Sequence, residues 1–362
     1  MSLSKIIVQK YGGSSLSDIK GIQQVARRIV ETIQQGYQVA VVVSAMGNTT
    51  NELLSLAKSN SATPPKRELD LLVSVGERVS MSLLAMAVQQ LGVQAKSFTG
   101  SQSGIITDTN HVSAAIVEVR PHRIQRALEE GYVAIVAGFQ GMSLQKEVTT
   151  LGRGGSDTTA VALTAALQAE YCEICSDVAG VYSTDPRVVS NARLLDELSL
   201  DAAISMAKNG AKVLQAEALE FAQKSGITLV ANATRNPAGK GTRLTSTSMA
   251  SNPVAISFDR SVIQLFDPSE QTIIQIAPHI RFATTTGDRE MYIVNVRNIH
   301  EQHGGRAVAT VSVIGTGNVR SILNLLSSTQ VELWWSDAVS TTLLVEVEEV
   351  DEVVAILHEE LL

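Results

Sequence analysis

The sequence predicts an α/β fold in which a mainly parallel sheet carries helices on both faces. Apolar runs that fit buried strands alternate along the chain with segments of helical periodicity. Hydrophobic residues make up 44% of the 362 residues, whereas aromatic residues make up only 4%. Small aliphatic side chains therefore fill the core, as is typical of parallel strands that are buried on both faces.

The first elements follow one another in regular order. Residues 5–11, KIIVQKY, are predicted to form a strand that ends in two glycines. An amphipathic helix extends from about Ser17 to Gly36, because its apolar residues keep a spacing of three and four. The run QVAVVVSA, residues 38–45, is a buried strand. The helix after the loop MGNTTN ends at a pair of prolines, which cannot continue it.

The alternation continues through the middle of the chain. A long helical region from about Arg67 to Leu91 precedes the strands VQAKSF and YVAIVAGF. A glycine-rich turn then begins a helix that ends near Ala169, EYCEIC forms a strand, and DVAGVYSTDPR forms a loop. Two helices from about Asp201 to Ser225 precede the strand ITLVAN.

A change of composition divides the chain. The segment TSTSMASNP, residues 245–253, has the composition of a linker. We therefore expect one domain over residues 1–245 and a second region over 254–362, built from about 254–300 and 307–362. The last part has the order strand, helix, strand, strand, helix, which predicts a small α+β module, and the part before it is a shorter, weaker copy.

Charge and hydropathy exclude several classes of partner. The formal net charge is −7 and no lysine- or arginine-rich run is present, so we expect no nucleic acid partner. No stretch of about eighteen uninterrupted apolar residues occurs, so we expect no membrane partner. The start of the chain lacks the apolar region of a signal peptide, and the default expectation is a cytoplasmic protein.

The only two cysteines are Cys172 and Cys175, in YCEIC. A C-x-x-C pair is found in zinc and redox sites, but a strand sends positions i and i+3 to opposite faces. No second pair of cysteines or histidines accompanies them. We therefore expect two buried, reduced thiols, and no metal ligand is predicted.

The segment LGRGGSDTTAV, residues 151–161, has the composition of a ligand-binding turn. Its glycines let a backbone approach a ligand, and helix-terminal N–H groups attract anions. The planar fork of Arg153 suits a carboxylate or phosphate. Asp157 would repel such an anion unless it holds a cation in place. A plain glycine-rich turn is the alternative.

Other segments are ambiguous when each is considered alone. KYGGSS can hold phosphates, although it is not the Walker pattern and a plain turn fits as well. Glu77, in GERVS, fits either a solvated helix face or a cleft that binds an ammonium group. SDVAGVYSTDPR fits a ligand loop beyond a strand end or an ordinary surface loop. Lys212, in GAKVL, fits a solvated lysine.

Taken together and in order, seven segments resemble the aspartokinases of the amino-acid kinase family. They are KYGGSS, VSAMGNTT, GERVS, SFTGSQSG, LGRGGSDTTAV, SDVAGVYSTDPR and GAKVL. The resemblance covers nearly all of residues 3–245. It implies an αβα sandwich, and it implies phosphorylation of the side-chain carboxylate of L-aspartate by ATP to give 4-phospho-L-aspartate. Mg²⁺ would be held mainly by the nucleotide phosphates.

The resemblance also implies roles for individual residues. Asp157 would orient the catalytic lysines, which are Lys10 and Lys212. The residues that would bind the substrate are Thr50, Glu77, Arg153 and Ser156. The residues that would meet the phosphoryl group or frame the nucleotide are Lys10, Tyr11, Gly12, Gly13, Ser14, Ser44, Ser176, Asp177, Tyr182, Asp185, Arg187 and Lys212.

The C-terminal region resembles the paired ACT modules of the family in a compressed form. Its first module lacks a clear glycine-rich turn before a full helix, and its second carries VELWWSD where small, hydroxyl-rich residues are usual. Trp334 and Trp335 fit packing or interface positions, or alternatively fill an effector pocket. We therefore expect weak or absent feedback by lysine and threonine, and a homodimer or larger assembly through these modules.

Three other functions remain as alternatives. A kinase for another acidic amino acid, such as glutamate, would share the fold and the site. A catalytically silent amino-acid sensor would keep only the fold. An oxidoreductase would need G-x-G-x-x-G after the first strand, and KYGGSS lacks that spacing. The aspartokinase reaction would serve lysine, threonine and methionine synthesis or a specialised aspartate-derived product.

Overall fold

The computed structural model describes residues 5–211, 214–246, 252–286, 289–296, 305–315, 318–326, 329 and 331–362. These residues form two compact units. The first unit contains residues 5–181, 194–200 and 214–246. The second unit contains residues 182–193 and 201–211 together with the described residues from 252 onward. The chain therefore passes between the units several times.

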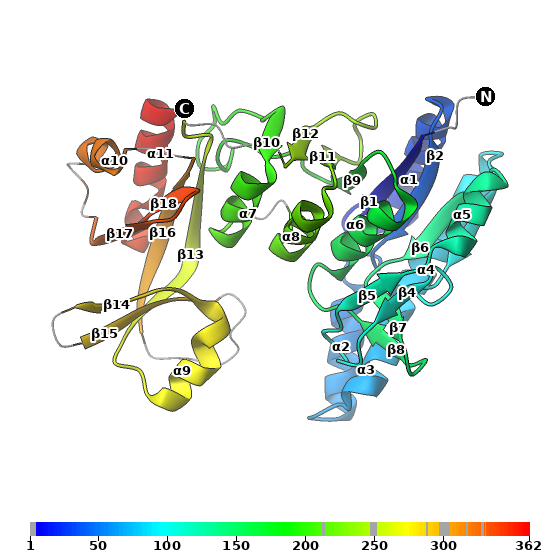
Figure 1. Ribbon diagram of the computed structural model, residues 1–362, viewed down its shortest axis with the longest axis horizontal. Helices are drawn as coiled ribbons and strands as arrows, with labels where there is room; N and C mark the ends of the chain where they lie inside the picture. Colours follow the sequence, from blue (N-terminus) through cyan, green and yellow to red (C-terminus); the bar gives the residue numbers. More distant parts are fainter. Residues whose placement is uncertain are drawn as a thin grey trace. The chain divides into compact units, whose positions relative to one another are not determined.

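The first unit is built on an eight-stranded sheet with the strand order β10-β12-β11-β9-β1-β2-β6-β3 (Figure 1). Neighbouring strands are parallel except for β11 and β12, which are antiparallel. The strands are β1 (Ile6–Tyr11), β2 (Gln38–Val43), β3 (Ala95–Phe98), β6 (Val133–Ala137), β9 (Cys172–Ser176), β10 (Glu197–Ser199), β11 (Leu229–Ala233) and β12 (Thr242–Thr245). The predicted mainly parallel sheet is confirmed.

Helices cover both faces of this sheet. Helices α1 (Ile19–Gln34) and α4 (Val75–Gln90) pack on one face, where Ile7, Val41 and Ile135 form a common core with them. Helices α5 (His122–Glu129), α6 (Gly155–Leu167) and α8 (Ala216–Ser225) belong to the other face, which α6 reaches at β1, β2 and β9. This arrangement is the predicted αβα sandwich.

The predicted long helix consists of two helices in succession. They are α3 (Lys66–Val73) and α4, with Ser74 between them, and α2 (Thr49–Asn60) precedes the prolines. Residues 66–90 are long and apolar enough to cross a membrane by length and composition alone, and 56% of the relevant window is buried inside the protein. Because Asp70 and Glu77 are among its buried side chains, the segment has the character of a core helix.

A small four-stranded sheet, absent from the sequence-based prediction, lies in the same unit. Its strand order is β5-β4-β7-β8. The strands are β4 (Ile105–Thr107), β5 (Ile116–Val119), β7 (Gln140–Ser143) and β8 (Val148–Thr150). Strand β8 ends immediately before the segment LGRGGSD, so this sheet leads directly into the glycine-rich turn.

The second unit contains a six-stranded antiparallel sheet with the order β14-β15-β13-β16-β18-β17. The strands are β13 (Ala255–Phe266), β14 (Ile280–Thr286), β15 (Arg289–Asn295), β16 (Arg306–Ile314), β17 (Leu333–Ser336) and β18 (Ser340–Val345). Its helices are α7 (Leu200–Lys208), α9 (Glu270–Ile276), α10 (Val319–Leu325) and α11 (Val350–Leu361). The predicted α+β character of this region is confirmed.

Two details of this unit bear on the sequence-based expectations. The weak first copy does contain a helix, α9, whose first turn is capped by the Ser269 hydroxyl. Trp335 stacks on Phe282 with ring centroids 4.7 Å apart, whereas 45% of Trp334 is exposed. Trp335 is therefore a partly buried residue that packs on Phe282 within this unit.

Cys172 and Cys175 are free, buried thiols in β9, as predicted. Burial raises the pKa of the Cys172 thiol to about 12 and that of Cys175 well above its ordinary value. Both side chains are therefore neutral near pH 7, and neither has the character of a nucleophile or a metal ligand.

Candidate functional site

The glycine turn after β1 lies against the turn after β2. The Gly13 carbonyl accepts hydrogen bonds from the N–H groups of Leu16 and Gly47, at 3.2 and 3.1 Å. A Cβ atom at Gly13 would lie 2.9 Å from the Ala45 carbonyl oxygen, closer than real Cβ contacts. Only glycine permits this approach, so KYGGSS and SAMGN form one backbone platform at the carboxyl end of the sheet.

Lys10 lies beside this platform and is paired with Asp157. The Lys10 Nζ and Asp157 Oδ1 atoms are 2.7 Å apart, and the two side chains are only 13% and 10% exposed. The Lys10 ammonium also lies next to Gly12, since a Cβ atom added to Gly12 would be 3.5 Å from Lys10 Nζ. The sequence-based interpretation expected an acid that holds a cation at this point, and the geometry fits it.

The N-terminus of α6 completes this corner. Gly154, with φ at +68°, caps the helix, and Asp157 lies in the first turn, where the helix dipole favours a carboxylate. The same dipole and the N–H groups of the first turn favour an anionic ligand. A lysine ammonium and a helix N-terminus therefore lie together, a combination that favours the binding of a phosphate.

Glu77 is a buried carboxylate with one unsatisfied oxygen. It is 2% exposed, its Oε1 accepts the Ala45 N–H at 3.1 Å, and its Oε2 has no partner among the described residues. Gly76 allows this approach, because a Cβ there would lie 2.7 Å from the Ala45 Cβ. Burial raises the pKa of Glu77 to about 7, although the Ala45 N–H acts in the opposite direction. A cationic ligand would restore its charge.

The other predicted substrate residues differ in exposure. Ser156 is buried, and its Oγ would lie 2.9 Å from a Cβ on Gly138, which follows β6. Thr50, in the first turn of α2, is half-buried. Arg153 is exposed between two glycines of positive φ, where its guanidinium can reach a ligand. Ser156 thus lies at the corner described above, and Arg153 lies on the loop that leads into it.

Three of the predicted nucleotide residues lie near the platform and differ in which of their groups can reach a ligand. The Tyr11 side chain is fully buried, and its hydroxyl donates to the Gln9 side chain, so only its backbone is available to a ligand. The Ser44 N–H donates to the Tyr11 carbonyl at 3.1 Å, which joins the ends of β1 and β2. Ser14 is exposed.

The end of β9 is joined to the first glycine turn through Thr234. The Thr234 N–H donates to the Ser176 carbonyl at 2.8 Å, and its hydroxyl lies 2.6 Å from the Ser15 hydroxyl. Ser176 uses its own hydroxyl on the Val178 backbone, and Asp177 is exposed. The predicted residues of the first unit therefore lie at the carboxyl ends of neighbouring strands.

The remaining predicted nucleotide residues belong to the second unit. Tyr182, Asp185 and Arg187 lie in residues 182–193. The Arg187 guanidinium donates to both carboxylate oxygens of Asp185, with a shortest distance of 2.6 Å. This loop is held to α11 by a hydrogen bond between Ser183 Oγ and His358 Nε2. Lys212 lies outside the described residues.

A buried ionic network that the sequence reasoning missed supports the platform. Arg28 of α1 pairs with Glu173 of β9 at 2.8 Å, and its guanidinium donates to the carbonyls of Ala233, Thr234 and Asn236. Gln9 donates to the same carboxylate. The sequence does contain a signal for this network, which is a polar residue in the middle of each of two buried strands. Buried polar residues need hydrogen-bond partners.

Comparison with known proteins agrees with this geometry. Residues 5–230 match the model of the amino acid kinase family. The aspartokinase of Mycobacterium bovis is 56% identical over 223 residues, covering 61% of this chain and 53% of that protein. The aspartokinase of Corynebacterium glutamicum is 53% identical over 225 residues, covering 62% and 53%. The chain thus matches about half the length of these curated relatives.

Solved structures share the fold over almost the whole chain. E. coli aspartokinase III in complex with aspartate and ADP superimposes with a TM-score of 0.82 at 23% identity, covering 98% of this chain and 99% of that one. Aspartate kinase from Synechocystis gives a TM-score of 0.62 at 29% identity, covering 98% and 68%. With the family match extending over most of the chain, the protein belongs to the amino acid kinase family.

Proposed function

We propose that the protein is an aspartokinase, which transfers the γ-phosphoryl group of ATP to the side chain of L-aspartate. The observation that carries this proposal is the Lys10–Asp157 ion pair, held at the carboxyl end of the sheet between a glycine platform and a helix N-terminus. The aspartokinases that are 53–56% identical over the matched region support the choice of substrate.

The reaction needs alignment and charge neutralisation more than acid–base chemistry. A side-chain oxygen of L-aspartate bonds to the γ-phosphorus of ATP while the bond to the β,γ-bridging oxygen breaks, and ADP leaves with that oxygen. The acceptor carboxylate is already an anion, so no general base is required. Lys10 neutralises charge on the phosphoryl oxygens, and Asp157 fixes the position of the ammonium. Lys212 is proposed as the second cation.

The substrate would be held at both ends of its backbone. Glu77 offers its unsatisfied oxygen to the α-ammonium group, which restores the charge that burial disfavours. Arg153 donates to the α-carboxylate, since a guanidinium forms two parallel bonds to such a group. Thr50 and Ser156 are proposed to complete the substrate contacts. The side-chain carboxylate is then directed toward Lys10.

The nucleotide would lie along the strand ends. The proposed contacts are Lys10, Tyr11 through its backbone, Gly12, Gly13, Ser14, Ser44, Ser176, Asp177, Tyr182, Asp185, Arg187 and Lys212. No group of three histidine, cysteine, aspartate or glutamate side chains suited to a metal occurs among the described residues. Mg²⁺ is proposed to be held mainly by the nucleotide phosphates, whose charge it would neutralise.

The proposal also covers how the protein is regulated and how it assembles. Residues 1–245 would be the catalytic domain, and residues 254–362 would be a compressed ACT-like region with weak or absent feedback by lysine and threonine. The Phe282–Trp335 stack supports this, because it fills space inside that region with fixed aromatic rings. A cytoplasmic homodimer or larger assembly, joined through this region, is proposed, and light scattering tests the assembly.

The first experiment is ATP-dependent hydroxamate formation with purified protein. Hydroxylamine traps the acyl phosphate, and the assay is run with L-aspartate, L-glutamate or other acidic amino acids, with and without millimolar lysine and threonine. Product with L-aspartate that persists in the presence of both amino acids is the expected result. The product route beyond 4-phospho-L-aspartate, either lysine, threonine and methionine or a specialised compound, is outside this assay.

Other outcomes change specific parts of the proposal. Product with glutamate alone would move the substrate and keep the site. Inhibition of the wild-type enzyme by lysine or threonine would refute the weak feedback. No product with any acid would contradict the kinase assignment and favour an amino-acid sensor.

A further inference from the structure

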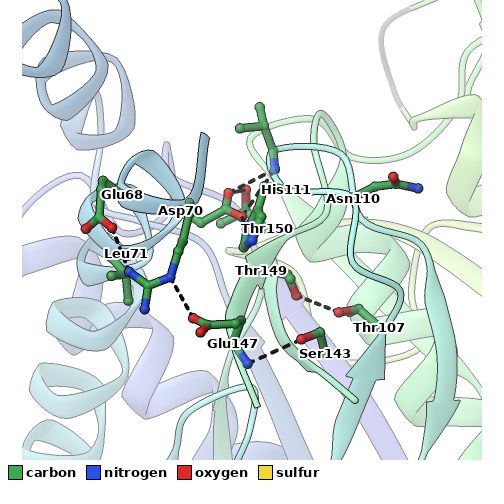
Figure 2. Close-up of polar contacts among 12 residues, drawn as sticks. Glu68, Asp70, Leu71, Thr107, Asn110, His111, Ser143, Glu147, Thr149 and Thr150 are labelled. Carbon is green, nitrogen blue, oxygen red and sulfur yellow. Dashed lines mark hydrogen bonds and ion pairs between the residues drawn. The ribbon is translucent and has the colours of Figure 1, made fainter. Parts of the chain in front are cut away.

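Asp70 is a fully buried carboxylate that is contacted by three residues from two separate segments of the chain. It lies in α3 and is 0% exposed. Its Oδ1 accepts the Thr150 hydroxyl at 2.5 Å and the Val112 N–H at 3.0 Å, and its Oδ2 lies 2.6 Å from His111 Nδ1. Figure 2 shows Asp70 facing His111 and Thr150, which belong to different segments of the chain. Its lone pairs are thus used inside the protein.

The contact with Val112 fixes an unfavourable backbone conformation. Val112 has φ at +75°, in the left-handed region that a β-branched residue seldom adopts. Such a conformation is unfavourable and persists only where surrounding contacts determine it. Here the Asp70 carboxylate accepts the Val112 N–H with both oxygens. The shape of the loop around Val112 therefore depends on Asp70.

The same contacts hold the base of the Arg153 loop. Thr150 is the last residue of β8, and its carbonyl accepts the Ala114 N–H at 2.9 Å. Gly152, with φ at +76°, lies next to the Val112 carbonyl, since an added Cβ would be in ordinary van der Waals contact with that oxygen at 3.4 Å. Asp70 thus binds both the residue before the loop and the segment on which the loop rests.

Asp70 is also connected rigidly to Glu77. Both lie on the α3–α4 segment, with Glu77 about two helical turns later. The junction at Ser74 is fixed, because its hydroxyl donates to the Leu71 carbonyl and its own carbonyl accepts the Gln140 side chain at 2.9 Å. These two hydrogen bonds of Ser74 therefore oppose a shift of Asp70 relative to α4.

We propose that Asp70 is a positioning residue that sets the separation between Glu77 and Arg153. It holds the base of the Arg153 loop and is continuous with the helix that carries Glu77. The separation determines which amino acid fits, since these side chains bind the ammonium and the α-carboxylate. This inference rests on the proposed function, because it uses the roles assigned to Glu77 and Arg153.

A pair of neighbouring threonines provides the matched test. Thr150→Val removes the hydroxyl that binds Asp70 and keeps the shape of the side chain. Thr149→Val is the control, because Thr149 is equally buried on the same strand but its hydroxyl lies 2.6 Å from the Thr107 hydroxyl instead (Figure 2). Thr150→Val is expected to raise KM for L-aspartate about tenfold, the usual scale for a lost hydrogen bond to a charged group.

The distribution of effects separates positioning from general damage. In Thr150→Val, KM for ATP and kcat should stay within about threefold of wild type, and preference for L-aspartate over L-glutamate should fall. In Thr149→Val, all of these should remain near wild type. Asp70→Asn should show the same pattern as Thr150→Val, with a larger rise in KM. Equal KM values in the two threonine variants would overturn the proposal.

A second readout does not depend on catalysis. Amide hydrogen exchange, followed by mass spectrometry, should be faster over residues 151–155 in Thr150→Val than in wild type or Thr149→Val. Unchanged exchange in that segment would overturn the inference even if the wild-type protein phosphorylates aspartate. If exchange is faster in Thr150→Val but the wild-type protein phosphorylates no acid, the anchoring by Asp70 stands and the kinase assignment alone is refuted.

Discussion

Two buried ion pairs lie on opposite faces of β1, and they differ in how many other groups bind them. Successive strand residues point to opposite faces, so Gln9 faces α1 and Lys10 faces α6. On the α1 face, Arg28 pairs with Glu173, and the two side chains are 4% and 0% exposed. On the α6 face, Lys10 pairs with Asp157, and both keep some exposure.

Glu173 has every acceptor position in use. Its Oε2 accepts from Gln9 and forms an ion pair with Arg28, and its Oε1 accepts from the Asn232 side chain and the Gly239 N–H. A carboxylate bound in this way has no capacity left for a ligand. Its function is to hold β1, β9 and the loop after β11 together beneath the glycine platform.

The Asp157 carboxylate has a single ion-pair partner, Lys10, among the described residues. A pair with so few internal bonds can exchange contacts with a ligand at low cost, since few hydrogen bonds break. The comparison teaches that burial alone does not identify a catalytic charge. The number of internal partners distinguishes the structural pair from the pair that we propose to act in catalysis.

The largest expected effect is on stability, from Glu173→Gln. This change leaves the Arg28 guanidinium buried without its counter-charge, which typically costs about 3–5 kcal/mol. Urea unfolding followed by circular dichroism measures it. The control is Glu170→Gln, because the Lys5–Glu170 pair is exposed and should contribute about 0–1 kcal/mol. Equal, small effects of the two changes would remove the distinction drawn here.

The next effect is on turnover, from Lys10→Ala or Asp157→Ala. Each should lower kcat by about two orders of magnitude or more, the scale of an electrostatic stabiliser, with little change in unfolding. The hydroxamate assay and thermal melting measure the two quantities. Lys20→Ala, at an exposed position of α1, is the control and should match wild type. Near-normal turnover in either site variant would contradict the assignment of this pair.

The smallest expected effect is a gain in stability from Glu77→Gln that depends on pH. In the folded protein the pKa of Glu77 is raised to about 7 from 4.5, so wild type binds a proton that the unfolded chain releases between these values. Wild-type stability from this group is complete below about pH 4.5 and is lost as pH rises through about 7. Glutamine does not titrate and can still accept the Ala45 N–H.

The stability of Glu77→Gln relative to wild type should therefore grow from about pH 4.5 to 7 and then level off. Since each unit by which the pKa is raised corresponds to roughly 1.4 kcal/mol, the rise from 4.5 to about 7 sets an upper limit of about 3.5 kcal/mol on this gain. Melting temperatures of the variant and wild type, measured from pH 5 to 8, test this. The Glu77→Gln variant should also lose aspartate binding. A difference that does not vary with pH would mean that Glu77 is ionised in the folded protein.

The sequence predicted the elements that hydrophobic pattern determines. The main strands are runs of buried aliphatic residues, and the main helices have a clear period. The sheet β5-β4-β7-β8 was missed because its strands are three or four residues long and include polar segments such as QGMS. Such strands form only because tertiary packing places them side by side, which no local period reveals.

The candidate site was predicted through its motifs, and the supporting network was not. Lys10 and Asp157 belong to the glycine-rich segments, so their meeting could be expected from the resemblance. Gln9, Arg28 and Glu173 belong to segments interpreted only as strand and helix. Their partners are distant in sequence, and only the parallel register that sets Gln9 beside Glu173 brings them together.

The interleaving of the two units has a consequence for synthesis on the ribosome. Residues 182–193 and 201–211 are made before β13, which begins at Ala255, yet Val189 packs in the same core as residues of α10 and α11. At roughly 5–20 residues per second, α10 and α11 are synthesised roughly 6–35 s after Val189. In the nascent chain, apolar side chains such as Val189 thus stay exposed to solvent until α11 emerges. A chaperone could bind them during this period.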